Sequence, residues 1–247
     1  MNYQLIGNAV PDAEIGVLLP TYREAENISR LIDDIESLKL NSFILVIDDS
    51  SPDETAKIVQ EKQSKYSNIQ LCVRPKKSGL GTAITDGFKF FLSQKSPPKY
   101  IVTMDADYSH NPKDIPQLVS MMTETDCGIA IGSRYIKGGR IENWPFTRKI
   151  ISRSANFIAK FSLGLKPRDC TSGFRCYSTK FLNATIGNLH SHTYEIQIET
   201  IRQAHLRNFN VCETSILFVN RKSGKSKLSW TEIHSYITYT VKAIFHS

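Results

Sequence analysis

Residues 100–107 read Tyr-Ile-Val-Thr-Met-Asp-Ala-Asp and contain the clearest structural signal in the chain. The apolar run Tyr100–Met104 is typical of a buried β-strand, and two carboxylates, Asp105 and Asp107, follow it. In an open α/β sheet, ligands bind at the carboxyl ends of the strands. Two carboxylates there, with no basic residue beside them, favour a hard divalent cation that also contacts substrate phosphates, as in a nucleotide sugar. A capped turn is the alternative interpretation, because D-x-D alone is a short pattern.

On either side of this segment, strand and helix patterns alternate from residue 15 to residue 132. Short apolar runs occur at Ile15–Leu19, Phe43–Ile47, Ile69–Val73, Tyr100–Met104 and Cys127–Ile131. Helical patterns lie between them, near 24–38, 53–66, 80–93 and 113–123. This order predicts an α/β fold with a mostly parallel, Rossmann-like central sheet and helices on both faces.

The pattern is looser beyond residue 133. It predicts a basic loop, a helix near 147–163, a glycine-containing segment 168–177, a helix near 193–206, a strand over Val211–Val219 and a final helix from about 230. We predict one domain over 1–247, with a nucleotide-sugar-binding half (about 15–132) and an acceptor-binding half (about 133–247) that carries amphipathic helices. Three capping boxes predict helix starts: Thr21-x-x-Glu24, Ser51-Pro52-x-Glu54 and Ser229-x-x-Glu232.

Polar residues follow three of the predicted parallel strands. They are Pro20–Glu24 after the first strand, Asp48–Pro52 after the second and Asp105–Asp107 after the fourth. Because the carboxyl ends of parallel strands meet at one edge, we expect a pocket there for a base, a ribose and a diphosphate. For Thr21 and Ser51, helix capping is the simpler role.

The overall composition indicates an anionic partner. The chain has 31 Lys+Arg against 24 Asp+Glu, a net charge of +7, with 40% hydrophobic residues. Such an excess suits phosphate, nucleic acid or a membrane surface. The five cysteines form no C-x-x-C pair, and they read as reduced thiols of a cytoplasmic protein. We find no signal peptide and no apolar run of the roughly 18 residues needed to span a bilayer.

The positive charge is concentrated in residues 134–168, which hold nine Lys or Arg and one acid, Glu142. Large apolar side chains are interleaved with these cations. On the predicted helix 147–163, four of them form one stripe: Ile150, Phe157, Ile158 and Phe161. This stripe favours either a face packed on the core or an interfacial helix lying on anionic lipid. Nucleic-acid binding would also explain the charge, but no helix-turn-helix, zinc-finger or RNP pattern supports it.

Seven segments together identify a family. In order they are LLPTYREAENI, VIDDSSPDETA, GLGTAITDGF, VTMDADYSHNP, IGSRYIKGG, ENWPFTRKIIS and DCTSGF. From about residue 15 to 230 the chain resembles the inverting GT-A glycosyltransferases of family 2, and within them the dolichol-phosphate (polyprenyl-phosphate) mannose synthases. The first half is shared by many nucleotide-sugar transferases. The later segments, including RKSGKSKL, are more specific to the lipid-phosphate branch.

The resemblance implies roles for individual residues at the donor site. The nucleotide sugar would be bound by Pro20, Tyr22, Glu24, Ile47, Asp49, Asp105, Ala106 and Asp107. Mg²⁺ or Mn²⁺ would be held by Asp105, Asp107 and Ser109. Some relatives have Gln at the last position, and the shorter Ser hydroxyl would leave room for water in the metal's coordination shell. Gly79-Leu80-Gly81 would either let the backbone approach the donor or serve as an ordinary helix-start turn.

The resemblance also implies the acceptor site and the reaction. Arg134, Arg148 and Ser152 would hold the phosphate of a polyprenyl (dolichyl) monophosphate, and Arg221 and Lys227 would bridge the donor phosphates and the acceptor. Mannose would pass from GDP-mannose to that phosphate with inversion. The protein would then contact the cytoplasmic face of a membrane, with small membrane-anchoring subunits as partners. Two alternatives stay open: a glucosyltransferase that uses UDP-glucose, and a nucleotide-sugar or lipid-docking subunit without turnover.

Overall fold

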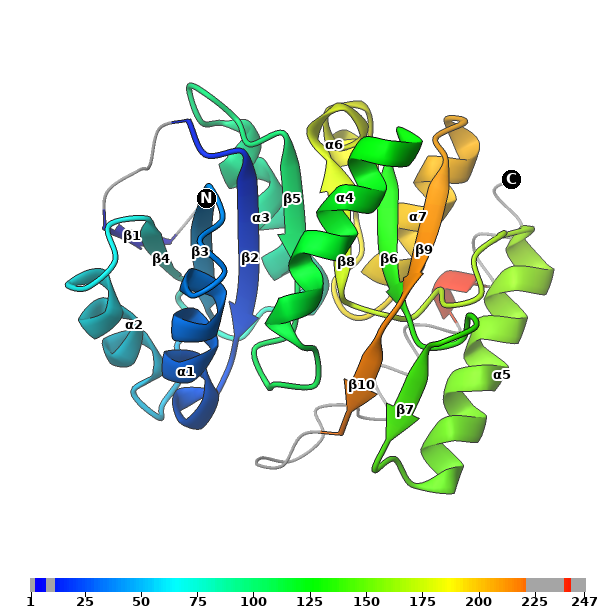
Figure 1. Ribbon diagram of the computed structural model, residues 1–247, viewed down its shortest axis with the longest axis horizontal. Helices are drawn as coiled ribbons and strands as arrows, with labels where there is room; N and C mark the ends of the chain where they lie inside the picture. The colour runs from blue at the N-terminus through cyan, green and yellow to red at the C-terminus, as the bar shows by residue number, and fades with distance from the viewer. Residues whose placement is uncertain (1–2, 8–11, 221–237, 241–247) are drawn as a thin grey trace.

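A computed structural model describes residues 3–7, 12–220 and 238–240, and Figure 1 presents its ribbon. Its main feature is one eight-stranded sheet in the order β1-β4-β3-β2-β5-β8-β6-β9. The strands are β1 (Gln4–Ile6), β2 (Ile15–Thr21), β3 (Ser42–Asp48), β4 (Ile69–Val73), β5 (Tyr100–Thr103), β6 (Ile129–Ser133), β8 (Arg175–Ser178) and β9 (Val211–Ser215). Only β1 and β8 run antiparallel to their neighbours. The predicted mostly parallel α/β sheet is therefore confirmed.

Helices cover both faces of this sheet. They are α1 (Ala25–Glu36), α2 (Thr55–Gln63), α3 (Leu80–Leu92), α4 (Ile115–Thr125), α6 (Thr179–Thr185) and α7 (Ile196–Leu206), with 3₁₀ turns η1 (Pro112–Asp114) and η2 (Ile186–Asn188). The helix α5 (Phe146–Leu163) belongs to neither of these two layers (Figure 1). In Figure 1, α1, α2 and α4 lie in front of the sheet and α3, α6 and α7 behind it. None of the helices in the described ranges is both long and apolar enough to span a bilayer.

The two faces of the sheet bury two separate hydrophobic cores, as the two-residue period of a strand requires. In β2, Val17 and Leu19 pack on the side of α1 and α4, whereas Leu18 packs on the side of α3. All three side chains are fully buried. Strands buried on both faces explain the continuous apolar runs in the sequence.

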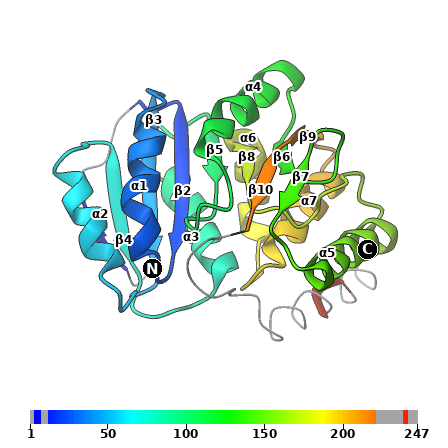
Figure 2. The ribbon, with the colours of Figure 1, turned by 60° about the horizontal axis from the view of Figure 1, so that its bottom comes forward.

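The predicted strand Val211–Val219 divides into two strands in different sheets. Its first part, β9, pairs with β6 as far as Ser133 and Ser215. The chain then passes the buried Ile216 and forms β10 (Leu217–Val219), which pairs with β7 (Arg140–Glu142) in a separate two-stranded sheet. In Figures 1 and 2 this small sheet extends from the carboxyl edge of the main sheet. One strand-like run in the sequence thus supplies both a strand of the main sheet and a second strand beside its carboxyl edge.

The capping-box predictions at Thr21 and Ser51 are wrong. Both hydroxyls instead donate to Oδ1 of the buried Asp48, at 2.9 Å from Thr21 and 2.5 Å from Ser51. Helix α1 begins at Ala25 and α2 at Thr55, each without a side-chain cap bond. The buried Asp48 outweighs a local cap because these two hydroxyls satisfy its Oδ1, while its Oδ2 accepts from the N–H of Ser51 at 2.8 Å. The third box, 229–232, lies outside the described residues.

Candidate functional site

The carboxyl ends of β2, β3 and β5 meet, as predicted, around one cavity, which we call the acidic cavity. It is lined by Pro20, Thr21, Tyr22, Glu24, Asp49, Lys77, Gly79, Leu80, Ala83, Asp105, Ala106, Asp107, Thr193 and Tyr194. Seven of the eight predicted donor-site residues are in this set. The exception is Ile47, whose side chain is buried in the core on the α3 side of the sheet and does not line the cavity.

Asp49 is held rigidly at the wall of the acidic cavity. Its Oδ1 lies 2.5 Å from Nε of Arg74, and its Oδ2 accepts from the backbone N–H of Ser78 at 3.1 Å. Arg74 is buried as well, and it also pairs with Asp86 at 3.2 Å. A carboxylate fixed in this way can present its remaining lone pairs to a ligand without losing side-chain entropy on binding.

The two carboxylates of the opening motif face this cavity with different exposure. The side chain of Asp105 is 38% exposed, whereas Asp107 is buried and its Oδ1 accepts from the N–H of Ser109 at 3.0 Å. Tyr108, between Asp107 and Ser109, has a left-handed φ of 60°, and its hydroxyl donates to Asp34 of α1 at 2.5 Å. The left-handed backbone at Tyr108 turns the chain sharply after Asp107, and the hydrogen bond to Asp34 holds this turn against α1.

Ser109, the third predicted metal ligand, lies off the cavity walls. It is buried, and its Oγ has no hydrogen-bond partner among the described residues. Its carbonyl accepts from the N–H of Val219 at 3.1 Å and so attaches β10 to the motif. The role of Ser109 as a ligand stays a prediction.

The donor set at this edge fits a hard cation. In the described part of the chain, no cluster of three or more His, Cys, Asp or Glu side chains could hold a metal alone. Asp105 and Asp107 offer oxygen donors in a cavity with room for a ligand. Mg²⁺ is bound in this way, by one or two carboxylates together with substrate phosphates and water.

His110 is a functional candidate that the sequence reasoning missed. It is buried, stacked on Phe174 and in edge contact with Phe218, with ring centroids 5.2 Å apart in both cases. Its Nδ1 accepts from the N–H of Asp105 at 3.4 Å. Burial lowers the pKa of His110 to about 4, so the ring is neutral near pH 7. In the sequence, the only indication of this role was the position of the histidine, three residues after Asp107.

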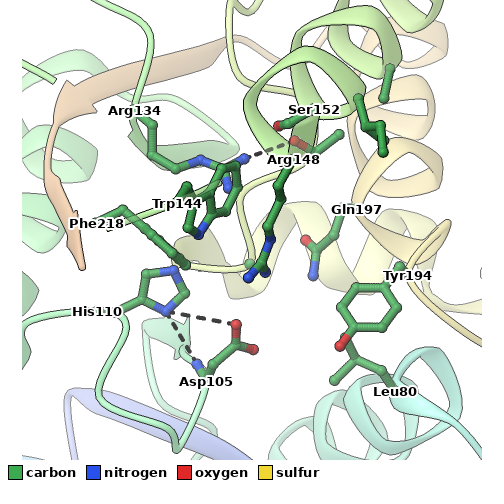
Figure 3. A pocket seen from close by; sticks show the side chains of 14 residues that line it. Leu80, Asp105, His110, Arg134, Trp144, Arg148, Ser152, Tyr194, Gln197 and Phe218 are labelled. Carbon is green, nitrogen blue, oxygen red and sulfur yellow. Dashed lines mark hydrogen bonds and ion pairs between the residues drawn. The ribbon is translucent and has the colours of Figure 1, made fainter. Parts of the chain in front are cut away.

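A second cavity adjoins the first, and we call it the basic cavity. It is lined by Leu80, Asp105, His110, Arg134, Trp144, Arg148, Ile151, Ser152, Ala155, Thr171, Gly173, Tyr194, Gln197 and Phe218. Figure 3 shows Arg134, Trp144 and Arg148 around one side of it, with Asp105 and His110 facing them. Leu80, Asp105 and Tyr194 line both cavities, so the two meet at these residues. The three predicted acceptor residues, Arg134, Arg148 and Ser152, are therefore brought together.

Arg134 is held by a carboxylate that the sequence reasoning did not assign. Its Nε and Nη2 lie 2.7 Å from Oδ2 and Oδ1 of Asp169, and both side chains are buried. Burial raises the pKa of the Asp169 carboxyl, but the facing guanidinium outweighs it and holds that pKa below its usual range. The charge of Arg134 is thus balanced on the side away from the cavity.

Arg148 and Ser152 are four residues apart on α5 and so lie on one face of that helix. The guanidinium of Arg148 lies 4.3 Å from the ring centre of Trp144, and its Nη1 donates to Asn220 at 3.1 Å. The hydroxyl of Tyr135 donates to Oγ of Ser152 at 2.8 Å. Arg221 and Lys227, which the resemblance assigns to bridging the donor phosphates and the acceptor, lie outside the described residues.

The glycines at the start of α3 have a structural explanation. A Cβ atom added to Gly81 would lie 2.4 Å from the carbonyl oxygen of Ser191. A Cβ atom added to Gly79, which has a φ of 100°, would lie 2.3 Å from the carbonyl oxygen of His192. The His192 carbonyl accepts from the N–H of Gly81 at 3.0 Å. Close packing of the loop before α7 therefore requires both glycines, whether or not a donor also approaches there.

The outer face of α5 is apolar and exposed. Phe161 is 81% exposed and Phe157 68%, and their rings stack with centroids 5.9 Å apart. The rest of the exposed set is Phe146, Ile150, Ile151 and Ile158. Asn156 and Ala159 are the residues that α5 buries. Of the two interpretations of this stripe, the one that placed it on the core is therefore wrong.

The sequence pattern of one family, Glycosyl transferase family 2, matches residues 16–185, more than half of the chain. The chain belongs to glycosyl transferase family 2. This family 2 glycosyltransferase is 34% identical to a polyprenol monophosphomannose synthase of Mycolicibacterium smegmatis over 88% of this chain and 82% of that protein. It is 36% identical to a dolichol-phosphate mannosyltransferase of Pyrococcus furiosus over 92% of this chain, and it spans 62% of that protein's length.

Solved structures show that this family 2 enzyme has the GT-A fold. A glucosyl-3-phosphoglycerate synthase from Mycobacterium tuberculosis, bound to Mn²⁺, UDP and glucosyl-3-phosphoglycerate, superposes with a TM-score of 0.67 at 16% identity, covering 95% of this chain and 79% of that one. A mannosyltransferase from Pyrobaculum calidifontis, bound to GDP-Man and Mn²⁺, superposes with a TM-score of 0.61 at 12% identity. This superposition covers 96% of this chain and 68% of that one.

Proposed function

We propose that this family 2 glycosyltransferase transfers mannose from GDP-mannose to a polyprenyl monophosphate. The observation that carries the proposal is that the acidic and basic cavities meet at Asp105. One cavity suits a metal-bridged diphosphate and the other an anionic acceptor, so the two substrates would meet where the cavities join. The choice of mannose and of a polyprenyl acceptor is supported by the relatives from Mycolicibacterium and Pyrococcus, whose names specify them.

Donor binding would use the acidic cavity. Asp105 and Asp107 would hold a divalent cation, Mg²⁺ or Mn²⁺, on the diphosphate of GDP-mannose, and that cation would offset the charge of the departing GDP. Tyr22 offers an aromatic surface at the cavity wall, with the Lys77 ammonium 4.7 Å from its ring centre. Asp49, fixed by Arg74, would bind the nucleoside.

The acceptor phosphate would act as its own nucleophile. A phosphate monoester has a second pKa near 6, so it is dianionic at neutral pH and needs no general base. One of its oxygens would attack the anomeric carbon of mannose as the bond to the GDP oxygen breaks, which inverts that carbon. Arg134, Arg148 and Ser152 would orient the phosphate, and catalysis would consist mainly of positioning and electrostatic stabilisation. Because Asp169 balances Arg134, the phosphate would be oriented with less loss of its nucleophilicity.

The lipid tail of the acceptor would lead to a membrane surface. The exposed apolar face of α5 begins beside the basic cavity, since Ile151 lines that cavity and is itself exposed. Arg153 and Lys160 are exposed on the same helix. An exposed apolar face with cations around it suits the interface of an anionic bilayer. We therefore propose peripheral contact of α5 with a membrane surface, on the cytoplasmic face that the sequence resemblance implies.

The test is transfer of radiolabel to extractable lipid. Purified protein with a polyprenyl phosphate and Mg²⁺ or Mn²⁺ is given labelled GDP-mannose or, in parallel, labelled UDP-glucose. Label in lipid from GDP-mannose alone is the expected result. Label from UDP-glucose alone would keep the reaction and overturn the sugar. If neither donor labels the lipid in detergent but transfer appears when membranes are added, a membrane-anchoring partner is indicated. Binding of both substrates without transfer under all conditions would indicate a docking subunit.

A further inference from the structure

We propose that Trp144 is a further ligand for the acceptor phosphate, donating a hydrogen bond from its indole N–H. The inference rests on the proposed function, because it takes a phosphate monoester as the occupant of the basic cavity. Trp144 lines that cavity and is only 8% exposed. Its Nε1 is buried and has no hydrogen-bond partner among the described residues. A buried donor without a partner is costly and calls for an explanation, such as a ligand that supplies the acceptor.

The surroundings of Trp144 identify the ligand as an anion. The guanidinium carbons of Arg148 and Arg134 lie 4.3 and 5.3 Å from the indole ring centre. Phe218 packs against the ring edge, with centroids 5.1 Å apart. Figure 3 shows the indole between the two arginine side chains on the wall of the cavity. The indole can only donate a hydrogen bond, so its partner is an acceptor, and the two guanidinium groups beside the ring favour an acceptor with negative charge.

A neutral donor suits this reaction better than a third cation would. Each positive charge near the acceptor phosphate lowers the nucleophilicity of its oxygens, and Arg134 and Arg148 already supply two. An indole N–H adds a directional hydrogen bond without adding charge. Its ring also interacts favourably with both guanidinium groups, which reduces the repulsion between them. Trp144 would therefore fix one phosphate oxygen and keep the other oxygens reactive.

The direct test is the indole N–H resonance. The chain has two tryptophans, Trp144 and Trp230, so a ¹⁵N spectrum has two indole signals, and Trp230→Phe assigns them. We expect the Trp144 signal to move downfield on titration with citronellyl phosphate, a short polyprenyl monophosphate that dissolves in water. GDP-mannose alone should leave it in place. If ³¹P spectra show the phosphate bound and the Trp144 signal does not move, the inference is wrong. If no phosphate monoester binds at all, the acceptor assignment of the proposed function fails too.

A kinetic test uses Trp144→Phe, which keeps an aromatic ring and removes only the N–H. The KM for the polyprenyl phosphate should rise about tenfold or more, as for loss of one hydrogen bond to a charged group, with the KM for GDP-mannose unchanged. The Tm of the ligand-free protein should not fall, because an unpaired buried donor is removed. Trp144→Leu, which also removes the ring, should lower kcat as well as raise this KM. A lowered Tm with an unchanged acceptor KM in Trp144→Phe would show a purely structural role and overturn the inference.

Discussion

Asp169 and Arg134 form a bidentate ion pair beside the basic cavity. Both N···O distances are 2.7 Å, and both side chains are buried. Asp169 also accepts from the backbone N–H groups of Arg134 at 3.0 Å and Ser172 at 3.0 Å. One carboxylate therefore fixes Arg134 and also holds the loop whose Thr171 and Gly173 line the same cavity. If the basic cavity binds the acceptor as proposed, acceptor binding and the stability of the fold both depend on Asp169.

Replacing that carboxylate should affect both properties. Asp169→Asn leaves Arg134 buried without its counter-charge, so we expect the free energy of unfolding to fall by about 3–5 kcal/mol. The KM for the polyprenyl phosphate should rise in the fraction that folds. Urea denaturation and initial-rate kinetics measure the two effects. Glu54→Gln, which breaks the exposed pair with Lys57, is the control and should change stability by less than about 1 kcal/mol. Equal effects of the two variants would contradict this role of Asp169.

The carboxylates of the D-A-D motif should make the transfer metal-dependent. Treatment with EDTA is expected to abolish mannose transfer, and excess Mg²⁺ or Mn²⁺ should restore it in the wild type. Asp107→Ala should stay inactive after metal is added back, because a ligand is lost. Glu124→Gln, at the exposed end of α4, serves as the matched control and should behave as the wild type. Near-normal turnover of Asp107→Ala in metal-containing buffer would contradict the metal assignment.

The exposed face of α5 should bind membranes. The double substitution Phe157→Glu/Phe161→Glu places two negative charges on it, and we expect loss of flotation with anionic vesicles. Transfer to a long-chain acceptor in vesicles should fall at least tenfold, whereas transfer to citronellyl phosphate in solution should stay within about twofold. Leu206→Glu, which changes an exposed apolar residue at the end of α7, is the control. If the double variant still floats with the vesicles, this face does not bind the membrane.

The buried His110 should make stability pH-dependent. Its folded pKa is about 4, whereas an unfolded histidine titrates near 6.5. Between these values only the unfolded chain binds the proton, so the free energy of unfolding falls as the pH drops from about 6.5 to about 4. The effect is on the order of 2–3 kcal/mol. His110→Asn should flatten this slope in urea denaturation at several pH values, while His205→Asn, at an exposed position, should leave it unchanged. Equal slopes in all three proteins would rule out His110 as the cause.

Much of the fold was predictable because the signals were local. The strands β2 to β6 are visible as short apolar runs, and the helices α1 to α5 and α7 as helical patterns between or after them. The same holds for the convergence of Asp49, Asp105 and Asp107, since it depends only on the strands being parallel. The stripe on α5 was visible as well, but its period fits a core face and an interfacial face equally. Only the packed structure shows that Phe157 and Phe161 are exposed.

The unpredicted features depend on partners distant in the chain. Strand β8 carries Arg175, which is fully buried and donates to the carbonyls of Cys170, Ser172 and Gln197, so it does not resemble an apolar strand. Asp169 acquires its role from Arg134, 35 residues earlier. Such burial of charged groups is favourable only when the fold brings the partners together, and no local pattern records that.

A transfer site at the junction of the cavities is tested by measuring mannose transfer with the purified wild type and with Asp105→Asn, which changes one of the three residues that line both cavities. Labelled GDP-mannose, a polyprenyl phosphate and Mn²⁺ are supplied, and label is counted in the organic phase. We expect labelled lipid from the wild type and at least a hundredfold less from Asp105→Asn, with both proteins equally stable to urea. Equal labelling by the two proteins, or none from the wild type in detergent and with membranes, would contradict a transfer site at the junction of the cavities.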